Sequence, residues 1–513
     1  MSVRVVFDRD VPVADIDRRV FGSFAEHMGR SIYQGIYEPG SPYADDQGLR
    51  TDVADLVREL GVTTVRYPGG NFLSGYDWKD GIGPQEARPA RLDLAWHSLE
   101  TNRFGVDEFM AWCARVGVEP MMATNLGTGT LTGAIELLEY CTVEAASRYA
   151  TLRAAHGHPE PYRVRTWCLG NEMDGPWQIG HQSADEYGRK AAEVARAMRM
   201  IDPELELVAC GSSNRTMATF GAWEDTVLEH TYDQVDFISL HQYYDPDDEL
   251  ASFLGSGAHL EAFITEVIAV ADAVKARRGS PKTIHLSLDE WNVWRQSEHA
   301  ALDTPVGWDE APRLIEDVYT VTDAVVVGDL LISILRHADR VRMACLAQLV
   351  NVIAPIRAEP DAPAWRQTIF HPFALTARHA LGRALTTTVR APGLPTSRHG
   401  EVPQVSAVAT FDEASGQGAL FLVHRGTDGP VEVELLPRGF EAAGAELLQH
   451  LALFDEDPGA ANVQGHPDRV VPRELPLTAT VGPAGGPLVS LPATSWNLVR
   501  FGSRHGGGAG VTH

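Results

Sequence analysis

Two segments, VDFISLHQY at residues 235–243 and TIHLSLDE at residues 283–290, carry the pattern from which the fold is predicted. Each is a short run of apolar and β-branched residues that ends in polar side chains, which is typical of a strand buried on both faces of a parallel sheet. Six further runs of this kind lie at residues 20–26, 62–67, 118–125, 164–171, 205–212 and 342–350. We therefore expect eight strands in one parallel sheet.

The segments between these runs have helical periodicity. Apolar side chains at positions 49, 53, 56, 57 and 60 fall on one face of a helix, and Gly61 follows in the C-terminal capping position. Similar patterns occupy residues 106–113, before Gly117, and residues 184–200. Strands that alternate with helices in this way predict an α/β fold, a (β/α)8 TIM barrel. The rival is an open doubly wound sheet of a dehydrogenase, which is disfavoured because no GxGxxG follows the first strand.

From about residue 381 the pattern changes to alternating runs such as VSAVATF (405–411), GALFLVHR (418–425) and VEVELL (431–436). These runs are typical of an antiparallel sandwich. The opening run VRVVFD (3–8) is also strand-like and could pair with that sandwich. We therefore expect a catalytic barrel at residues 18–380 and an all-β, jelly-roll-like sandwich made of residues 1–17 and 381–501. The glycine-rich tail at residues 502–513 is expected to be disordered.

Charge and cysteine usage restrict the partners. The 513-residue chain has a formal net charge of -26, which repels phosphate backbones and anionic lipid, so neither nucleic acid nor a membrane is expected as a partner. The most apolar stretch, residues 324–335, contains Asp329 and is too short to span a bilayer. The five cysteines show no CxxC spacing, and the opening residues lack the features of a secretion signal. These features predict a cytoplasmic protein.

Two carboxylates stand where a barrel of this kind places its active site, at the carboxyl ends of the strands. Glu172 ends the fourth expected strand and Glu290 ends the seventh, and each has an asparagine beside it. Other strands end in groups able to bind a hydroxyl, namely Glu26, Arg66, Asn71, Asn125, Ser212, His241, Tyr243 and Gln348.

This arrangement suits glycoside hydrolysis, which needs an acid beside the leaving oxygen and a second carboxylate facing the anomeric carbon. A separation of ~5–5.5 Å between the two permits a covalent intermediate and retention of configuration. Because strands four and seven lie across the rim from each other, Glu172 and Glu290 could meet over a sugar. Trp294 and Trp308 could present flat apolar faces to its ring.

Each of these residues also has a plainer interpretation. A glutamate at a strand end is usually a solvated loop residue or a partner for a helix N-terminus. The PGGN turn before residue 72 could simply need a positive φ. His241 could be a hydrogen-bonded core residue, and both tryptophans could pack in the core. The position of these residues at the strand ends is therefore compatible with a sugar hydrolase but does not distinguish it from other proteins with the same barrel.

A family resemblance narrows these alternatives. The motifs FGSFAEHMGR, VRYPGGNFLSGYDWKDGIGP, NRFGVDEFMAWC, NLGTG, CLGNEMDGPWQ, SLHQYY, LSLDEWNVW and AQLVNVIAPI occur in this order between residues 21 and 356, and LPATSWNLVRF follows at 491–501. They resemble the motifs of the α-L-arabinofuranosidases of glycoside hydrolase family 51. The resemblance implies a barrel with a β-sandwich built from both chain ends. It also implies retaining, exo-acting hydrolysis of terminal α-L-arabinofuranosyl groups.

The resemblance also assigns roles. It implies that Glu172 is the acid/base and Glu290 the nucleophile, and that Asn171 binds the sugar 2-hydroxyl. The remaining residues that it places around the bound arabinose are Glu26, Asn71, His241, Tyr243, Trp294 and Gln348. No cofactor is expected, and no metal is expected because the sequence has neither HExxH nor a compact His/Cys cluster. The expected partners are arabinofuranosyl oligosaccharides and, as in similar enzymes, further copies of the chain in a hexamer.

Two alternatives to this interpretation stay open in the sequence. One is a β-xylosidase or an endoglucanase of the same fold, which differs in the sugar released. The other is a sugar-binding protein that kept the barrel without catalysis. The presence of both glutamates with their neighbours argues against the second alternative.

Overall fold

A closed barrel of eight parallel strands forms the larger part of the protein, which we describe from a computed structural model covering residues 3–246, 249–299, 307–440, 445–477 and 480–502. Around the barrel the strands run in the order β2 (Gly22–Phe24), β3 (Thr64–Tyr67), β6 (Glu119–Thr124), β7 (Thr166–Leu169), β8 (Glu206–Ala209), β9 (Phe237–Tyr244), β10 (His285–Val293) and β11 (Val341–Leu346). Each of the eight expected runs overlaps one of these strands.

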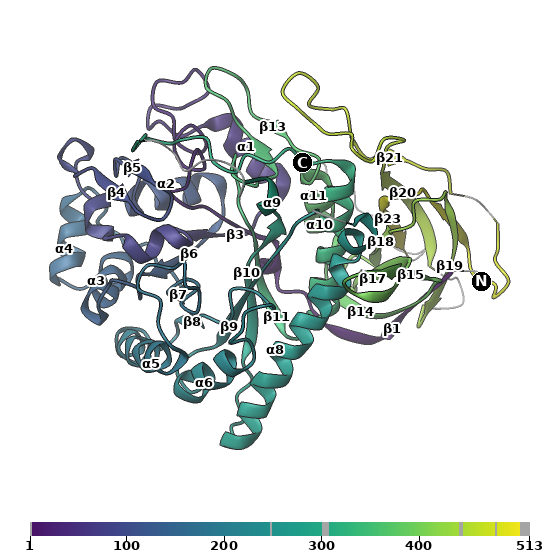
Figure 1. Ribbon diagram of the computed structural model, residues 1–513, viewed down its shortest axis with the longest axis horizontal. Helices are drawn as coiled ribbons and strands as arrows, with labels where there is room; N and C mark the ends of the chain where they lie inside the picture. Colours follow the sequence, from purple (N-terminus) through teal and green to yellow (C-terminus); the bar gives the residue numbers. More distant parts are fainter. Residues whose placement is uncertain (1–2, 247–248, 300–306, 441–444, 478–479, 503–513) are drawn as a thin grey trace.

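Helices surround the barrel, as Figure 1 shows. They are α1 (Thr51–Leu60), α2 (Val106–Val116), α3 (Leu131–Thr142), α4 (Arg148–Ala155), α5 (Ala184–Ile201), α6 (Ala222–Thr231), α7 (Leu250–Leu254), α8 (Ser256–Arg278), α9 (Gln296–His299), α10 (Val321–Arg336) and α11 (Phe370–His379). Gly61 and Gly117 end α1 and α2 in the left-handed conformation, with φ of 80° and 86°. The prediction of a (β/α)8 barrel is confirmed.

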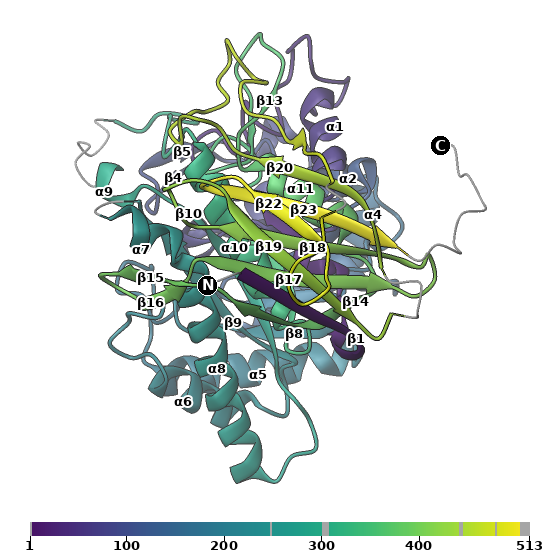
Figure 2. The same cartoon turned by 90° about the vertical axis from the view of Figure 1, so that its right-hand side faces the viewer.

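A nine-stranded sheet forms the second part. Its order is β21 (Arg473–Glu474), β20 (Glu446–Leu453), β23 (Ser495–Gly502), β18 (Gln417–His424), β17 (Val405–Asp412), β14 (Arg383–Arg390), β1 (Val3–Asp15), β19 (Val431–Arg438) and β22 (Leu488–Leu491). The N-terminal strand β1 lies between β14 and β19, antiparallel to the first and parallel to the second. Figure 2 shows this strand in purple among the green and yellow C-terminal strands.

The remaining strands form three two-stranded sheets, β4 (Arg91–Asp93) with β5 (Ser98–Glu100), β12 (Ile356–Arg357) with β13 (Trp365–Arg366), and β15 (Gly393–Thr396) with β16 (Gly400–Pro403). Of the tail expected to be disordered, Gly502 ends β23, and residues 503–513 lie outside the described part of the chain. Among the described residues no helix has the length and apolar character needed to cross a membrane.

The two faces of the large sheet pack against different cores, because alternate residues of a strand point to opposite sides. Along β23, Trp496 and Leu498 join the core shared with the barrel, whereas Val499 and Phe501 belong to a separate core of the sheet. The apolar helix α10 separates the barrel from the sheet (Figure 1). Its Asp329 accepts hydrogen bonds at 2.6 and 3.2 Å from Arg425, which follows β18, and both side chains are buried. The segment that looked most like a membrane span is therefore the junction between the two parts.

Candidate active site

A cavity of about 810 Å³ opens at the carboxyl ends of the barrel strands. Glu172 and Glu290 both line it, together with Glu26, Asn71, Tyr243, Trp294 and Gln348. Asn171 and His241 are not among its lining residues, but each contacts a residue that is. The barrel topology therefore brings all nine predicted site residues into one region.

Glu172 follows β7 in a left-handed conformation, with φ of 44°. Its Oε1 lies 2.9 Å from His241 Nδ1, and its Oε2 accepts a hydrogen bond of 2.7 Å from Trp177 Nε1. The residue is 9% exposed, and Trp177 is 48% exposed, so Trp177 stands between the buried carboxyl group and solvent. Both oxygens of Glu172 are therefore held in a defined orientation at the cavity.

Glu290 lies within β10 and is held from two sides. Arg66 Nη1 donates a hydrogen bond of 2.8 Å to its Oε1, and the Tyr243 hydroxyl donates one of 2.9 Å to its Oε2. Burial raises the pKa of Tyr243 well above its ordinary value of 10, and the charge of Glu290 raises it further, so the phenol stays a neutral donor. The two donors, one on each oxygen, therefore fix the orientation of this carboxylate.

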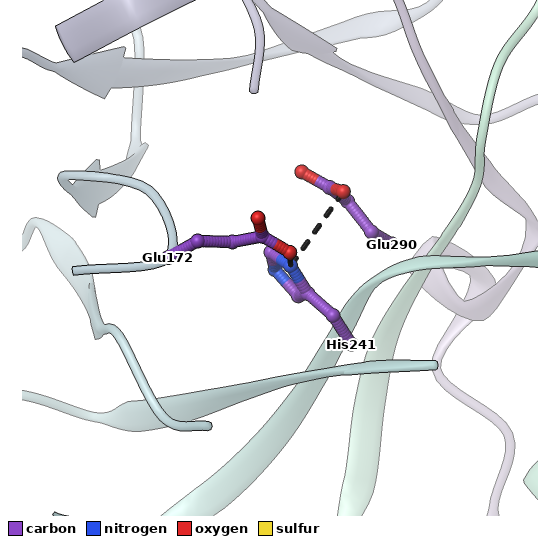
Figure 3. Close-up of side chains that lie close together, drawn as sticks. All are labelled: Glu172, His241 and Glu290. Carbon is purple, nitrogen blue, oxygen red and sulfur yellow. Dashed lines mark hydrogen bonds and ion pairs between the residues drawn. The ribbon is translucent and has the colours of Figure 1, made fainter. Parts of the chain in front are cut away.

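The two glutamates face each other across His241, as Figure 3 shows. One oxygen of each lies within 4.8 Å of the other and of His241 Nδ1. This spacing is shorter than the ~6.5–9.5 Å that leaves room for a water between the carboxyl groups of an inverting enzyme. The two carboxyl groups are therefore close enough to face the same sugar carbon.

The same three side chains have the composition of a metal site. Their facing atoms, however, already have partners in one another and in Arg66, Trp177 and Tyr243. Among the described residues this group is thus a hydrogen-bonded cluster of carboxylates and an imidazole, with Arg66 supplying a compensating positive charge.

Glu26 lies at the base of the cavity and differs from the other two carboxyl groups. Burial raises the pKa of Glu26 to about 8, against the hydrogen bond from the Phe72 amide, and the charge of Glu290 raises it further. Its Oε1 accepts hydrogen bonds of 2.9 Å from Phe72 N and Trp96 Nε1, and its Oε2 accepts one of 3.0 Å from Gln348 Nε2. At neutral pH Glu26 is therefore a neutral carboxylic acid.

The asparagines form the side of the site nearest Arg66. Asn171 Oδ1 accepts a hydrogen bond of 2.7 Å from Arg66 Nη2, and Asn171 Nδ2 lies 3.4 Å from Asn71 Oδ1. On the other side Trp294 packs edge-to-face on Tyr243, with ring centroids 5.2 Å apart. Trp294 thus forms a wall of the cavity, as the sequence pattern suggested.

Trp308 takes a different place. Its ring packs on that of His97 in a tilted arrangement, with centroids 3.9 Å apart, and Trp308 is not among the residues that line the cavity. The idea that Trp308 faces the sugar ring is therefore not supported in this state of the protein.

Sequence reasoning missed three residues of the site, namely Trp96, Trp177 and Asp289. Trp177 could have been found, because it follows Glu172 by five positions in the loop at the same strand end. Trp96 lies in the turn between β4 and β5, and its approach to Glu26 could not be predicted from the strand pattern. Asp289 was passed over because a neighbour of Glu290 in a regular strand would point away from it.

Comparison with known proteins gives a consistent result. Residues 56–250 match the family described as "Alpha-L-arabinofuranosidase 1 domain", and residues 289–495 match "Alpha-L-arabinofuranosidase C-terminal domain". An "Intracellular exo-alpha-(1->5)-L-arabinofuranosidase" of Streptomyces lividans is 52% identical over 97% of this chain and 75% of its own length. An "Exo-alpha-(1->6)-L-arabinofuranosidase" of Bifidobacterium longum is 48% identical over 97% and 96%. The solved structure of a family 51 α-L-arabinofuranosidase from Bifidobacterium longum superposes with a TM-score of 0.92 at 45% identity, and covers 97% of this chain and 99% of the other.

Proposed function

The chain belongs to the α-L-arabinofuranosidases of glycoside hydrolase family 51, and from that premise we propose which of its residues carry out the reaction. It is a retaining, exo-acting α-L-arabinofuranosidase. The observation that carries our residue assignment is the pair of carboxyl groups with oxygens within 4.8 Å, held by different partners. Glu290 is the nucleophile and Glu172 is the acid/base.

The different surroundings of the two glutamates support this division. Arg66 and Tyr243 both donate to Glu290, which orients its carboxylate and aims it from β10 into the cavity. Glu172 lies nearer to solvent, beside Trp177, where the leaving group departs. In the first step Glu290 bonds to the anomeric carbon while Glu172 protonates the leaving oxygen. In the second step Glu172 accepts a proton from water, whose oxygen displaces Glu290.

Hydroxyl recognition falls to the neutral groups of the cavity. Gln348 Oε1 and Trp294 Nε1 are buried without a hydrogen-bond partner among the described residues. The oxygen can therefore accept a hydrogen bond from a sugar hydroxyl, and the indole N–H can donate one. Neutral Glu26 can donate as well as accept, unlike an ionised carboxylate. Asn71 and Asn171 complete the set on the opposite side. We assign these residues and His241 to the arabinose subsite or to its immediate support.

The substrate and the setting are inferred from the relatives. Their names include both α-(1→5) and α-(1→6) linkages, and several carry the word "intracellular". We propose that this chain acts inside the cell on short arabinofuranosyl oligosaccharides and that it assembles as a homo-hexamer. We also propose the domain division at residues 18–380, with residues 1–17 and 381–501 in the β domain, which the pairing of β1 with β14 supports. Light scattering after size exclusion measures the subunit number.

Substitution of the two glutamates tests the catalytic assignment. Glu290→Ala should nearly abolish turnover of an aryl α-L-arabinofuranoside, and azide should then give the product of inverted configuration. Glu172→Ala should retain the first step for substrates with good leaving groups, and azide should give the product of retained configuration. Glu193→Ala, which removes an exposed glutamate of α5, is the control and should match the wild type. Near-normal turnover by Glu290→Ala would show that the assignment is wrong.

A further inference from the structure

Asp289 and Glu290 are consecutive in β10, and yet both side chains face the centre of the site. The pairing of β10 with β9 passes from Ser287 opposite Ser239 to Glu290 opposite His241, so three steps along β10 match two along β9. The pairing with β11 shows the same extra residue between Leu288 and Trp291. This is a β-bulge, which re-aims side chains that regular alternation would separate.

Because of the bulge, Asp289 lies behind His241. His241 Nε2 is 2.9 Å from Asp289 Oδ1, and His241 Nδ1 is 2.9 Å from Glu172 Oε1 and 3.6 Å from Glu290 Oε2. The second oxygen of Asp289 lies 3.6 Å from Arg66 Nε. Asp289 is 1% exposed and is not among the residues that line the cavity, so it acts on the reaction only through its neighbours.

We propose that Asp289 is a positioning residue that keeps His241 as an imidazolium, and that this cation stabilises Glu172 each time the acid/base becomes a carboxylate. The argument rests on the proposed catalytic roles of Glu172 and Glu290. A neutral histidine carries one N–H and can donate to only one of two flanking carboxylates, whereas an imidazolium donates to both. The two carboxyl oxygens at 2.9 Å on opposite sides of the ring are placed so that the doubly protonated form can donate to both, which matters once Glu172 has become a carboxylate.

The charges around the ring agree with this protonation state. Burial by itself lowers the pKa of His241, but Glu290, Asp289 and Glu172 raise it well above its ordinary value. Burial likewise raises the pKa of Asp289, but Arg66 and His241 outweigh it and lower that pKa. The ionisable groups that face or approach the ring are Arg66, Cys168, Glu172, Asp174, Tyr243, Asp289 and Glu290.

The pair has a role in both steps of the reaction. In the first step the O–H bond of Glu172 breaks, its proton bonds to the leaving oxygen, and that oxygen keeps the electron pair of the broken C–O bond. The new carboxylate of Glu172 then accepts the hydrogen bond from His241 Nδ1. In the second step a proton of water passes to Glu172 while the water oxygen bonds to the anomeric carbon and Glu290 leaves. His241 keeps both protons throughout.

Asp289→Asn tests the role because asparagine has the same shape without the charge. The neutral imidazole would then donate from Nε2 to the asparagine and turn the lone pair of Nδ1 toward Glu172, which opposes the carboxylate form. We expect kcat to fall roughly 10- to 100-fold. The second step, which starts from the carboxylate, should slow more than the first. An aryl arabinofuranoside should therefore give a burst of phenol, azide should accelerate turnover with retention, and the acidic limb of kcat should move to higher pH.

Matched variants separate this role from damage to the barrel. Ser287→Ala removes a buried hydroxyl two positions earlier in β10 and should show no burst, no azide effect and an unchanged pH profile. If Asp289→Asn fails to fold, as judged by thermal melting, His241→Gln removes the same cation and should give the same three signatures. A foldable variant of either kind with the wild-type pH profile and no response to azide overturns the proposal. Should Glu172→Ala and Glu290→Ala also keep turnover, the catalytic assignment itself would be wrong.

Discussion

Glu26 is buried as a neutral acid, and its replacement by glutamine should change how the stability of the protein depends on pH. Burial raises its pKa from an ordinary value of 4.5 to about 8. Below pH 4.5 the carboxyl group is protonated in both the folded and the unfolded chain. Between the two values only the folded chain keeps the proton, so the free energy of unfolding falls as pH rises through this window.

The size of the effect follows from the width of the window. Each pH unit costs about 1.4 kcal/mol, which amounts to about 5 kcal/mol between pH 4.5 and 8. Unfolding of a 513-residue chain has an entropy of about 1 kcal/mol per kelvin, so about 1 °C of melting temperature corresponds to 1 kcal/mol. Glu26→Gln has no proton to lose. Relative to the wild type its melting temperature should therefore rise by about 4 °C from pH 5 to pH 8.

Glutamine fits the site because the neighbouring amide can turn over. Gln348 donates its Nε2 to Glu26 at 3.0 Å, and its Oε1 has no partner among the described residues. Rotation of Gln348 would let that oxygen accept from the amide of the new glutamine.

Differential scanning fluorimetry from pH 5 to pH 8 measures the effect, with Asp93→Asn as the matched control. Burial raises the pKa of Asp93 to about 6, so this control should gain stability over the wild type only up to about pH 6 and stay level above it. Melting temperatures of Glu26→Gln and wild type that run parallel from pH 5 to pH 8 would refute the reasoning, because Glu26 would then be ionised throughout.

Three further predictions concern the junction and the site. Arg425→Leu leaves Asp329 buried without its counter-charge and should lower the free energy of unfolding by about 3–5 kcal/mol, as measured by chemical denaturation. Adding Asp329→Leu to the same chain should restore most of that free energy. Trp177→Phe keeps a ring but removes the donor 2.7 Å from Glu172, so kcat should fall about 10-fold for poor leaving groups and less for nitrophenyl substrates; an equal fall for both would contradict this role. Tyr243→Phe removes the 2.9 Å hydrogen bond to the proposed nucleophile and should lower kcat/KM about 10- to 100-fold in steady-state assays, whereas an unchanged value would show that the phenol does not act on it.

The barrel could be predicted from local sequence alone. Parallel strands buried on both faces are continuous apolar runs, and such a run can be recognised without knowing which strand it pairs with. The strand ends then located Glu172 and Glu290, since every strand of a barrel delivers its last residues to the same rim. The start of β1 was likewise recognisable as a strand. The sequence did not show that β1 pairs with β14, which begins at Arg383, and with β19, which begins at Val431. Pairing between strands so far apart in the chain depends on how the barrel brings the two chain ends together.

The same contrast applies to the active site: its catalytic residues were predictable from the sequence, and the contacts around them were not. The sequence by itself determined the residue types at the site and the strand ends that carry them. Through the family resemblance it also indicated the reaction, retaining hydrolysis of α-L-arabinofuranosides. Only the tertiary structure decided that a bulge turns Asp289 toward His241, that Trp96 reaches Glu26 from a distant loop, and that Trp308 packs on His97 instead of lining the cavity. The physical reason is that hydrogen bonds and burial around a charge depend on atoms brought together from separate strands. The protonation state of Glu26 or His241 is therefore a property of the folded site and not of the residue.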